Sequence, residues 1–149
     1  MNQLKICVAG ATGWAGSELS KGIFHTSDME LVAAISRKNA GKTLGEVIGV
    51  EGLTTPIFES VEDALKTSPD VFVEYTKPDA AKLHALSALK NGAHVVIGTS
   101  GLSGEDYEEI DAVAKEVKRG VLAVGNFALT AVLLQKFRQA TSCMCLVVR

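Results

Sequence analysis

The chain has 149 residues, a length typical of one domain that can bury its own hydrophobic core. Apolar residues make up 47% of it and aromatic residues 5%, which excludes a disordered or fibrous chain. The net charge of -2 argues against a nucleic-acid partner, and no apolar run reaches the ~20 residues of a membrane helix. The three cysteines show no disulfide or zinc spacing, and the N-terminus has no signal-peptide layout. We therefore expect a cytoplasmic protein without a bound metal.

Short β-branched segments alternate with segments of helical periodicity along the chain. We expect strands at residues 4–9, 30–35, 56–58, 70–75, 93–98 and 121–124. We expect helices at residues 14–25, from Ser60, at 78–91, at 103–118 and from Leu129, and mostly loop with one helical turn at 39–55. In the first helix, Leu19, Gly22 and Ile23 are spaced for one buried face. The alternation predicts the α/β class, as a single Rossmann-type domain with a doubly wound parallel sheet.

The first candidate ligand site is the turn between the first strand and the first helix, which reads GATGWAG from Gly10 to Gly16. A helix N-terminus presents unpaired N–H groups and a partial positive charge, which favour a phosphate there. We expect Gly10 to permit the turn, Gly13 to admit a pyrophosphate and Gly16 to let the helix pack on the strand. The G-x-x-G-x-x-G spacing is a variant of the dinucleotide fingerprint. Its place at the start of a βαβ unit favours nucleotide binding over a plain turn.

The second candidate site follows the second strand, at Ser36, Arg37 and Lys38. Domains that prefer NAD place a carboxylate near this point to bind the ribose hydroxyls. Residues 36–42 contain no carboxylate and offer instead a hydroxyl and two cations, which suit a 2′-phosphate. We therefore expect NADPH as the cofactor, with NADH as the alternative.

Three further polar segments come at the carboxyl ends of later strands, at residues 74–78, 98–101 and 125–128. Open α/β sheets bind ligands at this edge. Three loops rich in hydroxyl and backbone N–H groups on one edge favour a binding role over simple turns.

Taken together, the motifs G-A-T-G-W-A-G, Y-T-K-P, G-T-S-G and G-N-F-A resemble the cofactor-binding half of the dihydrodipicolinate reductase family, from about Lys5 to Phe137. This family, also called 4-hydroxy-tetrahydrodipicolinate reductase, serves bacterial lysine and diaminopimelate biosynthesis. The resemblance implies hydride transfer from NADPH or NADH to a cyclic dicarboxylate imine. It implies contacts with the pyrophosphate from Gly10, Ala11, Thr12, Gly13, Trp14 and Ala15, and contacts with the adenosine ribose from Ser36, Arg37 and Lys38. It places Tyr75 and Lys77 near the cofactor, and Gly98, Thr99 and Ser100 at the nicotinamide ribose. It places Gly125, Asn126, Phe127 and Ala128 at the nicotinamide and substrate. The family often has an arginine where this chain has Trp14.

The family's substrate-binding and proton-donating residues lie in a second domain, which has no counterpart in this sequence. We accordingly expect a dinucleotide-binding domain at residues 1–137 and an atypical tail at 138–149, and we assign no catalytic residue. We interpret the tail as a truncation with a shifted reading frame after Phe137. The chain is expected to bind cofactor without appreciable turnover.

Two other functions stay open. The opening G-A-T-G-x-x-G-x-E-L also resembles semialdehyde and acyl-phosphate dehydrogenases, which need a cysteine nucleophile with a basic partner. Cys143 and Cys145 have no recognisable histidine partner, and Cys7 lies inside the first expected strand. A noncatalytic NADP-binding module is the second alternative, and the oligomeric state is left open.

Overall fold

A six-stranded sheet, parallel throughout, forms the centre of the structure, a computed structural model that describes residues 3–124. Its strands are β1 (Leu4–Ala9), β2 (Met29–Ile35), β3 (Ile57–Phe58), β4 (Val71–Glu74), β5 (His94–Ile97) and β6 (Val121–Ala123). They lie in the order β3-β2-β1-β4-β5-β6, with β1 paired to both β2 and β4. The chain builds one half of the sheet outward from β1, then returns to begin the other half with β4. The strand order therefore reverses between β1 and β4, the place where open α/β sheets bind ligands.

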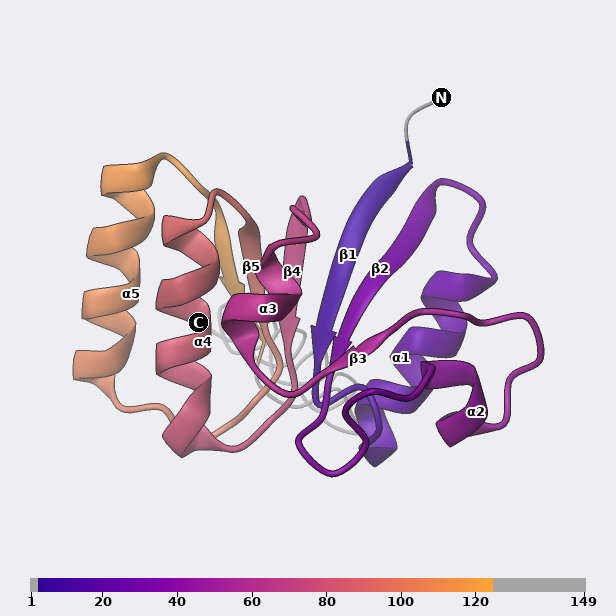
Figure 1. Cartoon of the computed structure of the whole chain (residues 1–149). Coiled ribbons are helices and arrows are strands. Elements are labelled where there is room, and N and C mark those ends of the chain that lie inside the picture. Colours follow the sequence, from indigo (N-terminus) through magenta and orange to yellow (C-terminus); the bar gives the residue numbers. More distant parts are fainter. Residues whose placement is uncertain (1–2, 125–149) are drawn as a thin grey trace, which may run out of the picture.

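Helices cover both faces of this sheet, as Figure 1 shows. The described helices are α1 (Trp14–Phe24), α2 (Leu44–Ile48), α3 (Val61–Leu65), α4 (Pro78–Lys90) and α5 (Gly104–Val117). Helices α1 and α2 pack on one face, and α3, α4 and α5 pack on the other.

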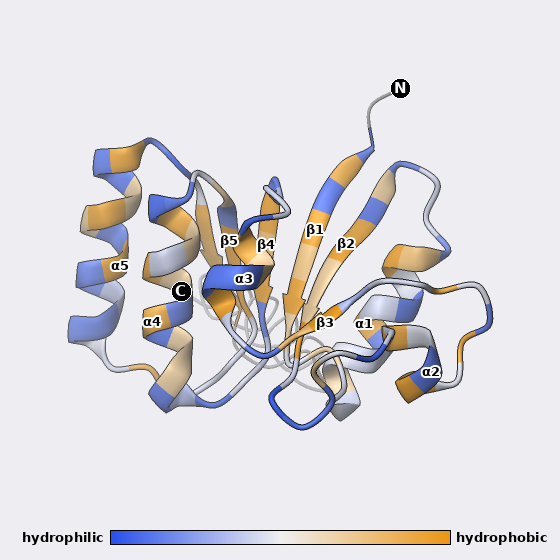
Figure 2. Cartoon of the chain, in the orientation of Figure 1, coloured by the Kyte–Doolittle hydropathy of each residue, from blue (hydrophilic) through white to orange (hydrophobic). Residues whose placement is uncertain are grey.

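The two-residue alternation of the strands divides the core between these faces. In β1, Cys7 and Ala9 join the cluster under α3, α4 and α5, whereas Ile6 and Val8 join the cluster under α1 and α2. Figure 2 shows the result, with apolar strands at the centre and polar residues on the outer surfaces of the helices. A sheet buried on both faces explains why its strands read as nearly continuous apolar runs in the sequence.

The elements expected from the sequence are confirmed across the described residues, with boundaries that move by one or two positions. The turn expected within residues 39–55 is α2, and Ser60 caps α3 by accepting a hydrogen bond from the backbone N–H of Asp63 at 3.1 Å. The helix expected from Leu129 lies outside the described residues.

The buried face expected for the first helix needs one correction. Gly22 is exposed, and the buried positions of α1 are Gly16, Ser20 and Ile23. Those three residues follow the spacing of four and three that a helix places on one side, whereas Gly22 is rotated about 100° from Ile23. Ser20 satisfies its buried hydroxyl by donating to the carbonyl of Gly16 at 2.7 Å.

Two glycines hold the turn after β1 in close contact with its surroundings. Gly10 has φ +77°, and a Cβ there would lie 2.4 Å from the carbonyl oxygen of Tyr75. A Cβ on Gly16 would lie 2.2 Å from the carbonyl oxygen of Gly10. Gly16 therefore packs α1 against the turn that precedes it, rather than against the body of the strand. No side chain larger than hydrogen fits either position without moving backbone.

Two glycine-to-alanine exchanges in α1 test this packing. Gly16→Ala is expected to lower the free energy of unfolding by about 1–3 kcal/mol, because the new methyl group forces backbone apart. Gly22→Ala meets no atom within 4 Å and should raise that free energy by up to about 1 kcal/mol through helix propensity. Urea unfolding followed by far-ultraviolet circular dichroism measures both. A Gly16→Ala variant as stable as Gly22→Ala would contradict the packing described here.

Candidate functional site

A cavity of about 760 Å³ opens at the carboxyl ends of β1, β2, β3 and β4. Its walls come from the turn after β1, the loops after β2, β3 and β4, and one face of α4. Seven residues predicted from the sequence line it, namely Gly10, Thr12, Gly13, Ser36, Arg37, Tyr75 and Lys77. The cavity thus lies beside the reversal of strand order and brings together three of the predicted segments.

The N-terminus of α1 adjoins this cavity at Gly13, and no side chain among the described residues caps it. Gly13 is its N-cap residue, no side chain accepts from its free N–H groups, and its first turn has no acidic residue. Each other helix in the described part of the chain has an acidic residue in its first turn, and Ser60 and Ser103 also cap α3 and α5. Helix α1 therefore keeps the N–H groups and the positive dipole end that an anion can bind.

A hydroxyl pair joins the glycine turn to the end of β2. The side-chain oxygens of Thr12 and Ser36 lie 3.0 Å apart, within hydrogen-bond distance, and the Asn39 amide donates to Ser36 at 3.4 Å. The backbone N–H of Gly10 also donates to the carbonyl of Ile35 at 3.0 Å. These contacts hold the two walls of the cavity in a fixed relation.

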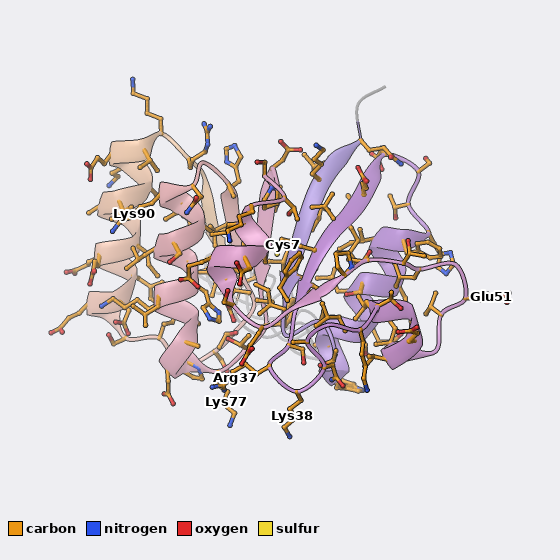
Figure 3. The ribbon with its side chains drawn as sticks, viewed as in Figure 1. Cys7, Arg37, Lys38, Glu51, Lys77 and Lys90 are labelled. Atoms are coloured by element: carbon orange, nitrogen blue, oxygen red, sulfur yellow. The ribbon has the colours of Figure 1, made fainter. Side chains whose placement is uncertain are left out.

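Basic side chains gather at the same edge of the sheet. Figure 3 shows Arg37 and Lys77 close to one another, with Lys38 further along this edge and Lys90 well away from it. Arg37, Lys38 and Lys77 are all exposed, so an anionic ligand can meet them without displacing packed groups. Partial burial raises the pKa of the Tyr75 phenol, which therefore stays protonated at neutral pH.

Within residues 3–124, the remaining predicted residues do not line the cavity. Ala11 is fully buried, Trp14 is 91% exposed, and the Thr99 hydroxyl is turned toward the carbonyls of Glu74 and Thr76, each at 3.3 Å. The other predicted and described residues that lie outside the cavity wall are Ala15, Lys38, Gly98 and Ser100. Gly125, Asn126, Phe127 and Ala128, together with Cys143 and Cys145, lie outside the described residues.

Sequence reasoning missed two parts of the wall. The first is the loop after β3 together with the first turn of α3, which contribute Glu59, Ser60 and Glu62. Its position depends on β3 pairing with β2, which a two-residue strand does not reveal. The second is a face of α4 formed by residues spaced three and four apart, namely Ala80, Leu83, His84 and Ser87. The sequence shows this helical spacing, but it does not show that this face of α4 is turned toward the cavity.

The carboxylate of Glu74 lies beneath this wall with no solvent exposure. One oxygen, Oε1, accepts from the backbone N–H of Thr76 at 2.6 Å and also from the Thr76 hydroxyl. The other oxygen, Oε2, lies 2.7 Å from Nδ1 of His84. The buried charge is thus hydrogen-bonded on both oxygens, as burial of a carboxylate requires.

Cys7 lies close to this charge on the neighbouring strand. Burial, and then the negative charge of Glu74, raises the pKa of the Cys7 thiol to about 12. A thiol of that pKa is protonated at neutral pH and is a poor nucleophile. Cys7 is therefore a core residue, as its place in the first strand predicts.

A second hollow, of about 1020 Å³, lies at the opposite edge of the sheet, where the strands begin. It is away from the glycine turn and from the carboxyl ends of the strands. Within residues 3–124 there is no group of three or more histidine, cysteine or acidic side chains placed to hold a metal ion. No described helix has the length and apolar character needed to cross a bilayer.

Comparison with known proteins identifies the family. The family model described as dihydrodipicolinate reductase, N-terminus, matches residues 4–127. The chain belongs to the dihydrodipicolinate reductase family. The 4-hydroxy-tetrahydrodipicolinate reductase of Syntrophomonas wolfei subsp. wolfei is 39% identical over 134 residues, covering 89% of this chain and 50% of that protein. The Bacillus pumilus enzyme is 38% identical and covers 90% of this chain and 50% of its own length, so the chain spans about half the length of these relatives.

One solved reductase structure agrees with this assignment, and a more distant solved structure shares the fold. A dipicolinate-bound dihydrodipicolinate reductase from Paenisporosarcina sp. TG-14 has a TM-score of 0.75 and 30% identity, over 91% of this chain and 52% of that one. GenD2 from gentamicin A biosynthesis, solved with NAD, has a TM-score of 0.71 at 15% identity, over 83% of this chain and 34% of that one, and shares the fold. The reductase resemblance is therefore confirmed over the semialdehyde dehydrogenase alternative.

The state of Cys7 can be tested by alkylation at pH 8. We expect iodoacetamide to leave Cys7 unmodified in the folded chain and to modify it in urea, because the folded thiol is buried and protonated. Peptide mass spectrometry separates Cys7 from Cys143 and Cys145. Rapid modification of Cys7 in the folded chain would contradict the burial described here.

Proposed function

We propose that this chain is the NADPH-binding part of a 4-hydroxy-tetrahydrodipicolinate reductase of bacterial lysine and diaminopimelate biosynthesis. The observation that carries the proposal is the uncapped N-terminus of α1 beside a cavity at the reversal of strand order. The bound cofactor supplies the hydride, and its acceptor is a cyclic dicarboxylate imine.

The residues of the glycine turn fit a pyrophosphate. The first N–H groups of α1 have no carbonyl partner within the helix, and no acidic residue in its first turn repels an anion. Gly13 lets a ligand approach, because it presents no side chain at the mouth of the cavity. The turn itself is held by the contact of Gly10 with the Tyr75 carbonyl, so little ordering is needed on binding.

The loop after β2 supports a preference for NADPH over NADH. Ser36 occupies the place where an NAD-binding domain has its ribose-binding carboxylate, and its hydroxyl is already tied to Thr12. Arg37 can donate two parallel hydrogen bonds to a 2′-phosphate, and Lys38 and Lys77 add positive charge at the same edge. NADH lacks the phosphate and gains little from these cations.

The nicotinamide belongs near the ends of β4 and β5 in this orientation. Thr99 holds the backbone there through its hydrogen bonds to Glu74 and Thr76, so it supports the pocket without facing it. We assign no described residue as a proton donor or as a ligand for the substrate carboxylates. We therefore propose that the chain alone binds cofactor and does not turn over substrate, and a cytoplasmic location stays a prediction.

The cofactor preference can be tested by calorimetric titration of the purified chain. We expect NADPH to bind more tightly than NADH. Arg37→Ala should lower the affinity for NADPH at least tenfold, since a charge-assisted hydrogen bond contributes about 1.5–3 kcal/mol. NADH affinity should change less than about twofold, and added salt should narrow the preference.

Lys90→Ala is the matched control, because it removes one exposed cation far from the cavity and should bind as the unaltered chain does. Equal losses for NADPH and NADH in Arg37→Ala would contradict a 2′-phosphate contact. A chain that binds neither cofactor would overturn the proposed function.

Turnover is tested by following NADPH absorbance with freshly generated 4-hydroxy-tetrahydrodipicolinate. We expect no oxidation above background from this chain, at concentrations where calorimetry shows cofactor bound. The Bacillus pumilus relative is the positive control. Reductase activity comparable to that relative would refute the proposal that the chain binds without turnover.

A further inference from the structure

Glu74 combines complete burial with contacts to two separate parts of the cavity wall. Through Oε1 it holds Thr76 in the loop after β4, and through Oε2 it holds His84 in the second turn of α4. Both Thr76 and His84 line the cavity, whereas Glu74 itself does not. The carboxylate thus acts on the site from behind its surface.

The core does not require a carboxylate at this position. Residues 72 and 74 point to the same face of β4, and Phe72 packs among apolar side chains there. Replacing a whole buried ion pair by well-packed apolar residues is often neutral or stabilising, so stability alone does not explain a carboxylate here. The position of Glu74 beneath the cavity therefore suggests a role in shaping the cavity surface.

The contact with Glu74 determines how His84 is presented. Thr76 already donates to Oε1, and Nδ1 of His84 faces Oε2, so Nδ1 carries the proton that this hydrogen bond needs. The imidazole also stands edge-on to the Phe72 ring, with centroids 6.5 Å apart at 75°. The ring is held from two sides, and its side chain retains 22% exposure at the cavity wall. Its second nitrogen, Nε2, lies on the edge away from Glu74.

We propose that Glu74 is a positioning residue that fixes His84 so that Nε2 contacts the adenosine half of the bound dinucleotide. The inference rests on the proposed function, since it assigns a contact within the same cavity. The adenosine half is indicated because His84 shares this cavity with Ser36 and Arg37, at the end of β2. The neighbouring Leu83 is 65% exposed and supplies an apolar surface beside His84. An apolar contact next to a fixed polar atom suits an adenine ring and its ribose.

Two exchanges separate this role from simple support of the fold. His84→Asn leaves an amide N–H near the position of Nδ1, which can still donate to Glu74, but it removes Nε2. Glu74→Gln replaces an acceptor oxygen by an NH₂ group that cannot accept from Nδ1–H of His84. His94→Asn is the matched control, because it makes the same exchange at the opposite edge of the sheet.

The probes are NADPH and 2′,5′-ADP, which carries the adenosine half alone, titrated into the 149-residue chain. We expect His84→Asn and Glu74→Gln each to lower the affinity for 2′,5′-ADP at least fivefold, and His94→Asn to leave this affinity unchanged. The urea midpoint of His84→Asn should match that of the unaltered chain. The double variant should bind no more weakly than Glu74→Gln, because both exchanges remove one contact. The ¹⁵N spectrum of His84 should show protonated Nδ1 in the neutral ring, and protonated Nε2 in Glu74→Gln.

Each other outcome decides against the inference. Unchanged 2′,5′-ADP affinity in His84→Asn overturns it even where Glu74→Gln fails to fold, since that variant keeps the buried hydrogen bond. If only Glu74→Gln lowers the affinity for 2′,5′-ADP, then Glu74 supports the fold or the loop that contains Thr76, and not the position of His84. If the unaltered chain binds neither NADPH nor 2′,5′-ADP, the proposed function itself fails, which is a distinct result.

Discussion

Gly10 and Tyr75 meet where the strand order of the sheet reverses, and the backbone of one touches the backbone of the other. A Cβ at Gly10 would stand 2.4 Å from the Tyr75 carbonyl oxygen, so the glycine turn and the loop after β4 share one packed surface. Gly16 extends that surface into α1, because it rests on the carbonyl of Gly10. The direction of α1, and with it the aim of its N–H groups, follows from these contacts. A small displacement of either loop would therefore reach the candidate phosphate site.

Electrostatics add a second level of order to this geometry. In the other described helices, acidic side chains of the first turn interact with the positive end of the helix dipole. In α5, for example, Ser103 and Asp106 cap the N-terminus. The hydrogen bonds from the backbone and side chain of Ser103, and the ammonium of Lys82, lower the pKa of Asp106 to about 2. In the described part of the chain, the first turn of α1 has no such partner. The contrast supports the interpretation that the free end of α1 is kept for an anionic ligand.

The sequence predicted the fold well because its main signals are local. Strand segments such as 4–9 and 93–98 are apolar and short, the helices between them have their own end signals, and parallel connection follows from the alternation. The exposure of Gly22 was predicted wrongly because glycine has no side chain whose polarity marks a face. The wall formed by Glu59 and Glu62 was missed for a different reason. It depends on which strand β3 pairs with, and a two-residue strand carries no pattern that identifies its neighbour.

Glu74 illustrates the limit of sequence reasoning most clearly. In the sequence it lies near the end of the expected strand at 70–75 and begins the polar segment at 74–78, and neither pattern predicts its burial or its partners. In the structure it ends β4 on the inward face, and its charge is balanced by the N–H and hydroxyl of Thr76 and by His84. Burial, and then this negative charge, raises the pKa of the nearby Cys7 thiol. Glu74 does not reach the cavity of the proposed phosphate site, because two of its hydrogen-bond partners lie between its carboxylate and the cavity. Thr76 and His84 are those partners, so they screen the charge and take their positions from it at the same time.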